Sequence, residues 1–252
     1  MKKYLLAGGL FLVFYSVFVI ATLPVNVALS WLELPKGLSL TKASGTIWHA
    51  EITQVTLQKK NQSNVEINKV TTNLSLASLF VLSPSIVIKF GGKSLDGPRG
   101  NLTLSGSLES PEISNANISL AANDIAKELT LPVDVSAFGM ASLALDSYVL
   151  GKPLCATAKG LITWPKAALN AFEQTVELGT IKAKVGCEKG VVVINVDPKN
   201  NLGLSFTTYI RNQRNISGNG YITPGNKFPK KLNELLPFIG KPDNKGRYRI
   251  GF

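Results

Sequence analysis

YLLAGGLFLVFYSVFVIATL, residues 4–23, contains no charged side chain. At about 1.5 Å rise per residue, a helix of this length just crosses the ~30 Å hydrocarbon core of a bilayer. Lys2 and Lys3 precede the run, and the next basic residue is Lys36. Because basic residues stay on the cytoplasmic side, this asymmetry predicts a single-pass anchor with a cytoplasmic N-terminus and the remaining chain on the far side.

A cleaved signal peptide is the alternative for the same run. The triplet at residues 19–21, Val-Ile-Ala, satisfies the small-residue rule before a cleavage site. The apolar core of a signal peptide is usually about 7–15 residues long, and this run is longer. We therefore expect a retained transmembrane anchor at residues 4–23 behind a cytoplasmic tail of residues 1–3.

Residues 24–36 form a predicted membrane-proximal collar. Val25, Ala28 and Leu29 recur at helical spacing, and Trp31 suits the boundary between membrane and water. The chain beyond it, residues 37–252, is long enough for one large β domain or two small ones.

From Leu38 onward the hydrophobic period changes from helical to two. Leu38 and Leu40, with Ile47 and Trp48 around Gly45, predict the first strand, and alternating segments separated by turns follow every ~8–12 residues. Short helices are predicted within residues 77–82, 121–131 and 228–240. The pattern predicts an all-β fold, mainly antiparallel: a curved sheet of meandering hairpins with a few short helices behind one N-terminal transmembrane helix.

A weak internal echo relates the two halves of this domain. Residues 45–48, Gly-Thr-Ile-Trp, have a counterpart in residues 160–164, Gly-Leu-Ile-Thr-Trp. A pseudo-repeat of residues 37–150 and 151–252 within one continuous sheet would explain the echo. Chance placement of aromatic residues on strands explains it almost as well.

The chain carries 27 basic and 16 acidic side chains, a formal charge of 27 − 16 = +11. A basic chain can indicate nucleic-acid binding, but the predicted topology places it where nucleic acid is scarce. An anionic membrane surface or an acidic partner fits better, and lysines scattered over strand faces fit without any partner. We expect no nucleic-acid partner.

Cys155 and Cys187 are the two cysteines of the chain. An even count in an oxidising compartment suggests one disulfide between them, and two buried free thiols are the alternative. With one histidine in the chain, a Cys/His zinc site is excluded.

The search for catalytic motifs is negative. His49 follows Trp48 near a strand end, where a half-exposed structural role is commoner than a catalytic one. Residues 92–94, Gly-Lys-Ser, look like the end of a phosphate loop, but the position that needs glycine is Val87. No G-x-S-x-G elbow is present. We therefore predict a non-enzymatic protein without catalytic residues, cofactor, metal or small-molecule substrate.

Two short motifs resemble a known family. The first is Ser44 with Gly45, Thr46, Ile47 and Trp48, and the second spans residues 235–248. The positions that carry the second motif are Pro237, Gly240, Pro242, Asp243, Gly246, Arg247 and Tyr248. Together with the anchor and the collar, they resemble the type II secretion system protein N family over the whole chain. Ala50 departs from that pattern, because the family tends to have glycine there.

The resemblance implies a subunit of the machine that exports folded proteins across the outer membrane. Such a subunit would sit in the bacterial inner membrane and face the periplasm, with the platform subunits C, L and M as partners. It would act by binding, and unpaired strand edges can recruit another chain. A membrane-anchored lipid-binding or lipid-transfer β groove is the alternative, because an apolar sheet face also suits acyl chains. A periplasmic hydrolase with a cleaved leader is disfavoured by the missing nucleophile–base pair.

Overall fold

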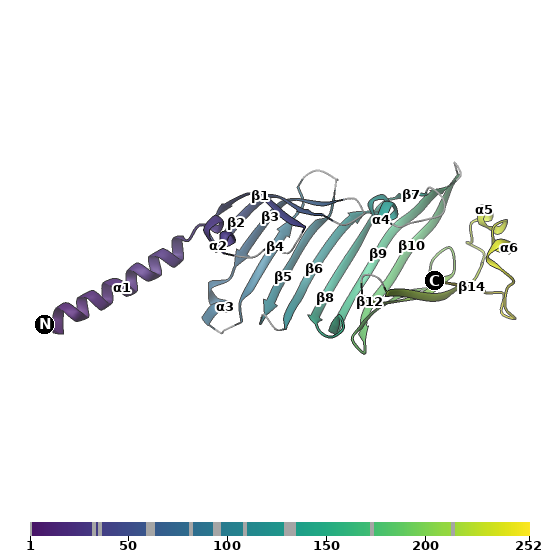
Figure 1. Cartoon of the computed structure of the whole chain (residues 1–252). Helices are drawn as coiled ribbons and strands as arrows, with labels where there is room; N and C mark the ends of the chain where they lie inside the picture. The colour runs from purple at the N-terminus through teal and green to yellow at the C-terminus, as the bar shows by residue number, and fades with distance from the viewer. Residues whose placement is uncertain are drawn as a thin grey trace.

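Figure 1 shows the fold of the chain in a computed structural model. It describes residues 2–31, 34, 37–58, 64–80, 83–92, 97–107, 110–128, 135–171, 174–212 and 215–252. Within these residues, fourteen strands form one sheet, and the helices are short apart from the first. The predicted all-β class is confirmed.

The N-terminal part begins with α1 (Lys2–Thr22) and the single-turn α2 (Val25–Ser30), which falls within the predicted collar. Large apolar side chains of α1, such as Phe11, Phe14 and Phe18, are exposed. No helix among the described residues has the length and apolar character needed to cross a bilayer.

The sheet follows as a run of hairpins with short helices between some of them. Its first half consists of β1 (Leu38–Gly45), β2 (His49–Leu57), β3 (Val65–Leu74), α3 (Leu76–Phe80), β4 (Ser85–Phe90), β5 (Arg99–Gly106), β6 (Pro111–Ala121), α4 (Ala122–Glu128), β7 (Val135–Phe138) and β8 (Met140–Leu150). Its second half consists of β9 (Cys155–Ala171), β10 (Gln174–Glu188), β11 (Val191–Val196), β12 (Leu204–Asn212), β13 (Asn215–Ile222), α5 (Lys230–Asn233), α6 (Leu236–Ile239) and β14 (Tyr248–Gly251).

Every strand pairing in the described part of the chain is antiparallel, and the spatial order follows the chain from β1 to β14. The exception is β7, which pairs with the last four residues of β9, beyond the part of β9 that pairs with β8. The strands of both predicted half-repeats thus belong to a single sheet. Its edges among the described residues are β1, next to α2, and β14, next to α6.

Three details differ from the sequence predictions. Ile47 and Trp48 were expected in the first strand, but β1 ends at Gly45, whose φ of +93° turns the chain. Alternation from Cys155 onward predicts a strand that ends at Trp164, before Pro165. The observed β9 continues through Pro165, because that proline lies between the stretches of β9 that pair with β8 and with β7. The helix expected within residues 228–240 is two separate turns, α5 and α6, and residues 129–131 of another predicted helix lie outside the described residues.

In two strands, consecutive apolar residues are three positions apart instead of two, yet their side chains stay on the same face of the sheet. Ile67 and Val70 are separated by Lys69, whose φ of +50° lies in the left-handed region. Asn115, with φ of +49°, separates Ile113 from Ala116 in the same way. A left-handed residue rotates the strand, so the apolar side chains on both sides of it stay on one face of the sheet.

One face of the sheet is apolar from β4 to β14. A row of directly opposite residues crosses from β4 to β14: Phe90, Gly100, Ile118, Leu143, Ile162, Ala183, Val196, Phe206, Gly220 and Ile250. The row beginning one residue earlier reads Lys89, Asn101, Asn117, Ala144, Leu161, Lys184, Asn195, Thr207, Asn219 and Gly251, which is mostly polar. We call these two sides the apolar face and the polar face.

The sheet bends. Cα atoms of β9 and β11 approach within 8 Å although β10 separates them, whereas second neighbours in a flat sheet lie ~9.6 Å apart. Most buried apolar side chains of the sheet belong to the apolar face, among them Ala50, Ile52, Val70, Ala116 and Leu145. Side chains crowd on the inside of a bend, so we infer that the apolar face is the inner one.

No second layer stacks on this face among the described elements. The helices make their main contacts at the rims: α2 with β1, α4 with β6 and β7, and α6 with β14. Figure 1 shows the same arrangement, with helices at strand ends and α1 projecting from one end.

Candidate interaction surfaces

The turn between β1 and β2 fastens the N-terminal helix to the sheet. The indole Nε1 of Trp48 donates a hydrogen bond to the carbonyl oxygen of Ile20 at 3.1 Å, and the amide of Ile47 donates to the carbonyl oxygen of Leu23, also at 3.1 Å. Pro24 and Thr46 form an isolated antiparallel bridge. The first family motif therefore holds the end of α1 against the start of the sheet.

Gly45 is required by the geometry of this turn. Its φ of +93° disfavours other residues, and a Cβ placed there would collide with the carbonyl oxygen of His49. That oxygen also accepts a hydrogen bond from the amide of Thr46 at 3.0 Å. Ala50, opposite Gly45 in β2, is 2% exposed, so a small residue remains at the position where the family pattern has glycine.

His49 is the first residue of β2, and its ring contacts the neighbouring strand. Its Nδ1 lies 2.6 Å from Oδ1 of Asn73 on the neighbouring strand, and the side chains are exposed. The pair joins β2 to β3 beside the turn.

The second family motif forms a compact turn before β14. Nε of Arg247 donates to Oδ2 of Asp243 at 2.8 Å, and a second guanidinium nitrogen contacts the same oxygen at 2.8 Å. The amides of Lys245 and Arg247 donate to Oδ1 of Asp243, and Gly246 supplies a left-handed φ of +69°. The guanidinium also lies over the ring of Tyr221 on β13, 4.3 Å from its centroid, so the turn is held to the sheet.

This network lowers the pKa of Asp243 to about 2, mainly through its side-chain hydrogen bond with Arg247. The folded pKa lies below the ordinary value of 3.8, so the contribution to stability is present above pH ~4 and is lost as pH falls through about 2. We expect a carboxyl titration followed by NMR to place Asp243 at about pH 2 and Arg247→Leu to return it toward its ordinary range. Titration of Asp243 near 3.8 in the unchanged chain would contradict this pairing.

The two motifs lie at opposite edges of the sheet. Residues 45–48 connect β1 to β2, whereas Tyr248 begins β14 and pairs with Ile222. Pro237 and Gly240 lie in and after α6, and Pro242 precedes the Asp243 turn. The structure therefore does not bring the motifs into one site.

Cys155 and Cys187 form a disulfide with a Cα–Cα distance of 6.1 Å. Cys155 is the first residue of β9, and Cys187 is the penultimate residue of β10. The bond therefore closes the open end of the β9–β10 hairpin.

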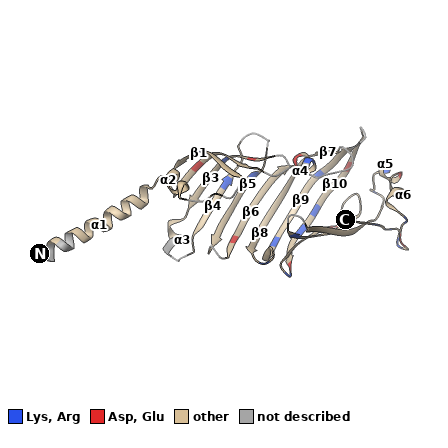
Figure 2. Ribbon diagram, viewed as in Figure 1, with Lys and Arg blue, Asp and Glu red and all other residues tan. Residues whose placement is uncertain are grey.

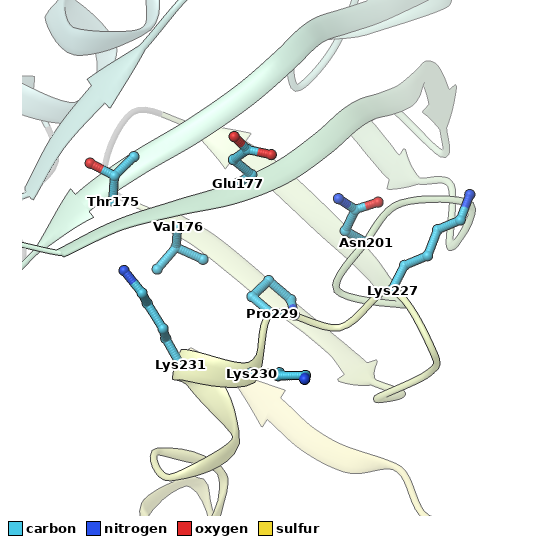
Figure 3. A pocket seen from close by; sticks show the side chains of 8 residues that line it. All are labelled: Thr175, Val176, Glu177, Asn201, Lys227, Pro229, Lys230 and Lys231. Atoms are coloured by element: carbon cyan, nitrogen blue, oxygen red, sulfur yellow. The ribbon is translucent and has the colours of Figure 1, made fainter.

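Sequence reasoning missed a cavity at the other end of this hairpin. Residues 175–177 and Asn201 line one side, and Lys227 with residues 229–231 lines the other, around a volume of about 370 Å³. In Figure 3, Val176 points toward Pro229 and Lys231, while Thr175 and Glu177 lie on the other side of the strand. Three lysines against one glutamate make the cavity cationic.

Other lysines lie along the polar face. Figure 2 shows basic segments on β9 and β10, where Lys159, Lys182 and Lys184 are exposed. Lys159 contacts the carboxylate of Asp146 at 3.5 Å. An exposed pair of this kind contributes little to stability.

Comparison with known proteins assigns the chain to a family. The family model described as type II secretion system (T2SS), protein N matches residues 36–251, which includes both motifs. The chain belongs to the type II secretion system protein N family. It is therefore related to components of the type II secretion system.

Curated relatives of the same name match over nearly their full length. The type II secretion system protein N of Vibrio cholerae serotype O1 is 30% identical over 98% of this chain and 97% of its own. Those of Aeromonas hydrophila and Pectobacterium carotovorum are 25% and 22% identical, each over 100% of this chain and 98% and 97% of their own. No solved structure matches the chain.

Proposed function

We propose that this protein is a non-enzymatic, inner-membrane subunit of the type II secretion system that acts through protein–protein contacts in the periplasm. The observation that carries the proposal is the family match over residues 36–251. The platform subunits C, L and M are the proposed partners, as the family resemblance implies.

Anchoring by α1 is part of the proposal. Residues 4–23 hold no charged side chain, and the described apolar side chains of α1 are exposed. Trp31, 72% exposed after α2, suits the membrane–water boundary. A periplasm-dependent reporter fused after Phe252 should be active, and mature protein should retain residues 1–23. A mature N-terminus at Thr22 would show a cleaved leader instead.

Contacts with the platform are proposed at the membrane-proximal end of the sheet. There β1 offers an unpaired edge among the described residues, beside α2 and the Trp48 junction. An exposed edge strand can extend its sheet with a strand from a partner. If α1 crosses the inner membrane, this edge lies where periplasmic segments of neighbouring inner-membrane subunits begin.

Trp48→Phe tests this site with a matched control. The substitution keeps an aromatic ring but removes the donor to the carbonyl of Ile20. Trp164→Phe removes an equivalent bond, 2.8 Å from Nε1 to the carbonyl oxygen of Phe138, near the short strand β7. Each change should lower the free energy of unfolding by about 0.5–1.5 kcal/mol.

Only Trp48→Phe should reduce the amount of C, L and M that co-purifies with the full chain. A reduction of about tenfold corresponds to ~1.4 kcal/mol of binding free energy. Equal losses for the two variants would indicate a general stability effect, and no loss for Trp48→Phe would place the contacts elsewhere.

The alternative function, a lipid-binding groove, has one specific observation in its favour. The apolar face runs across the sheet without a covering layer among the described elements. A secretion subunit and a bound lipid are compatible, so this surface is considered separately below.

A further inference from the structure

The apolar face is a half-buried surface without a covering layer among the described elements. Its row from Phe90 to Ile250 contains no polar side chain, and several members, such as Ile162 and Phe206, are only half-buried. Extensive contiguous apolar surface is unfavourable in water and marks a binding site. An extended peptide would leave its own polar backbone unpaired against such a surface. Acyl chains have no polar groups to satisfy.

The cationic cavity lies at one end of β10, on a path that leads to this face. Val176 at the cavity and Ala183 in the apolar row are 183 − 176 = 7 residues apart along β10. This separation corresponds to a strand length of about 20–24 Å. Between them, Leu178 is 3% exposed and Ile181 is half-buried. One leaflet of a bilayer, headgroup included, measures about 20–22 Å. A phospholipid extended along β10 therefore matches the distance from cavity to row.

Charge favours an anionic headgroup in the cavity. Lys227, Lys230 and Lys231 against Glu177 give 3 − 1 = +2 at its walls. Ammonium groups bind phosphate oxygens through charge-assisted hydrogen bonds. A second copy of the chain is a poorer occupant of the apolar face, because each copy carries a formal charge of +11.

We propose that the chain binds one anionic phospholipid, with its phosphate among Lys227, Lys230 and Lys231 and its acyl chains along β10 on the apolar face. The source of this lipid is the bilayer that holds α1, and in that respect the inference rests on the proposed location. The junction of Trp48 with Ile20 fixes the β1 end of the sheet beside α1, so under the proposed location the apolar face begins next to that bilayer and β10 lies farther along the sheet.

The first test uses the full chain extracted in mild detergent. Native mass spectrometry should show a one-to-one phospholipid adduct. After delipidation, vesicles of phosphatidylglycerol should reload the chain better than vesicles of phosphatidylcholine, while inorganic phosphate at millimolar concentration should not displace the lipid. Absence of an adduct both before and after reloading would overturn the proposal.

Two sets of variants test the headgroup and acyl contacts separately. Changing Lys227, Lys230 and Lys231 together to Gln should reduce the preference for phosphatidylglycerol by about tenfold or more. The same change at Lys182, Lys184 and Lys241, which are exposed and outside the cavity, should leave the preference unchanged.

Ile181→Glu places a charge on the acyl path and should abolish the adduct, whereas Thr180→Glu, at an exposed neighbouring position, should retain it. The lysine variants change surface residues only, so they decide the headgroup question even if Ile181→Glu fails to fold.

Other outcomes would overturn the inference. Release of lipid by inorganic phosphate would indicate a free-phosphate site. A dimer without lipid that Ile181→Glu dissociates would show that a second copy covers the face. Phospholipid binding that neither the lysine variant nor Ile181→Glu changes would exclude a lipid site along β10. Co-purification of C, L and M should be unchanged in the lysine variant, so failure of this inference and failure of the proposed secretion role give different results.

Discussion

Reduction of the Cys155–Cys187 disulfide is expected to lower the free energy of unfolding by about 3–4 kcal/mol on the chain-entropy model. The bond links residues 32 apart and encloses nearly all of β9 and β10. These strands occupy the middle of the sheet order, with β8 on one side and β11 on the other. Loss of the cross-link therefore raises the conformational entropy of the unfolded chain, in the segment that forms the middle of the folded sheet.

The cleanest measurement compares oxidised and reduced forms of the unchanged chain in denaturant. Cys155 is 1% exposed, so substitution would add a packing or polar penalty that reduction avoids. A double variant, Cys155→Ala with Cys187→Ala, should be insensitive to reductant and serves as the control. Oxidised and reduced chains that unfold within about 1 kcal/mol of each other would show that the bond constrains little.

The strands could be predicted because alternation and turn residues are local signals. Segments such as Asn101 to Ser105 alternate regularly and lie in β5. The short strand β7 was missed because four residues give too little periodicity, and its pairing with the end of β9 is set by tertiary structure.

The sequence did not predict that the apolar face lacks a covering layer. Alternation shows that one face of a strand avoids water, but it is the same whether a second sheet or a ligand covers that face. The row of paired residues from Phe90 to Ile250 exists only once the register of ten strands is known. Sequence therefore left a protein-contact surface and a lipid groove as alternatives.

The Asp243 turn and the cationic cavity also differed in how far the sequence could predict them. Asp243 and Arg247 are four residues apart, so their pairing is local and accompanies a recognisable motif. The cationic cavity joins Glu177 to Lys227, which are 227 − 177 = 50 residues apart, and neither belongs to a motif. The lysine spacing at residues 227–231 was the available signal, but it did not indicate the opposite wall.

Gly45→Ala is expected to lower the free energy of unfolding by about 3 kcal/mol, since a left-handed φ and a backbone collision are both imposed at one site. The added Cβ would meet the carbonyl oxygen of His49, which the amide of Thr46 already holds. Relief requires the β1–β2 turn to open. Opening would separate Ile47 from the carbonyl of Leu23 and move Trp48 away from Ile20.

Gly225→Ala is the matched control, because nothing lies within 4 Å of a Cβ at that position and its φ is not left-handed. We expect it to change stability by about 0.5 kcal/mol or less.

Hydrogen exchange should separate a local from a global effect. In Gly45→Ala, the amide of Ile47, bonded to Leu23, and the amide of Leu74, bonded to Trp48, should lose protection first. Because the bond from Ile47 to Leu23 attaches the sheet to the end of α1, the same variant should also bind less of the platform subunits if the proposed membrane-proximal contacts are correct. Equal stability and exchange in the two alanine variants would show that the turn tolerates a side chain and that the glycine of the first motif has another role.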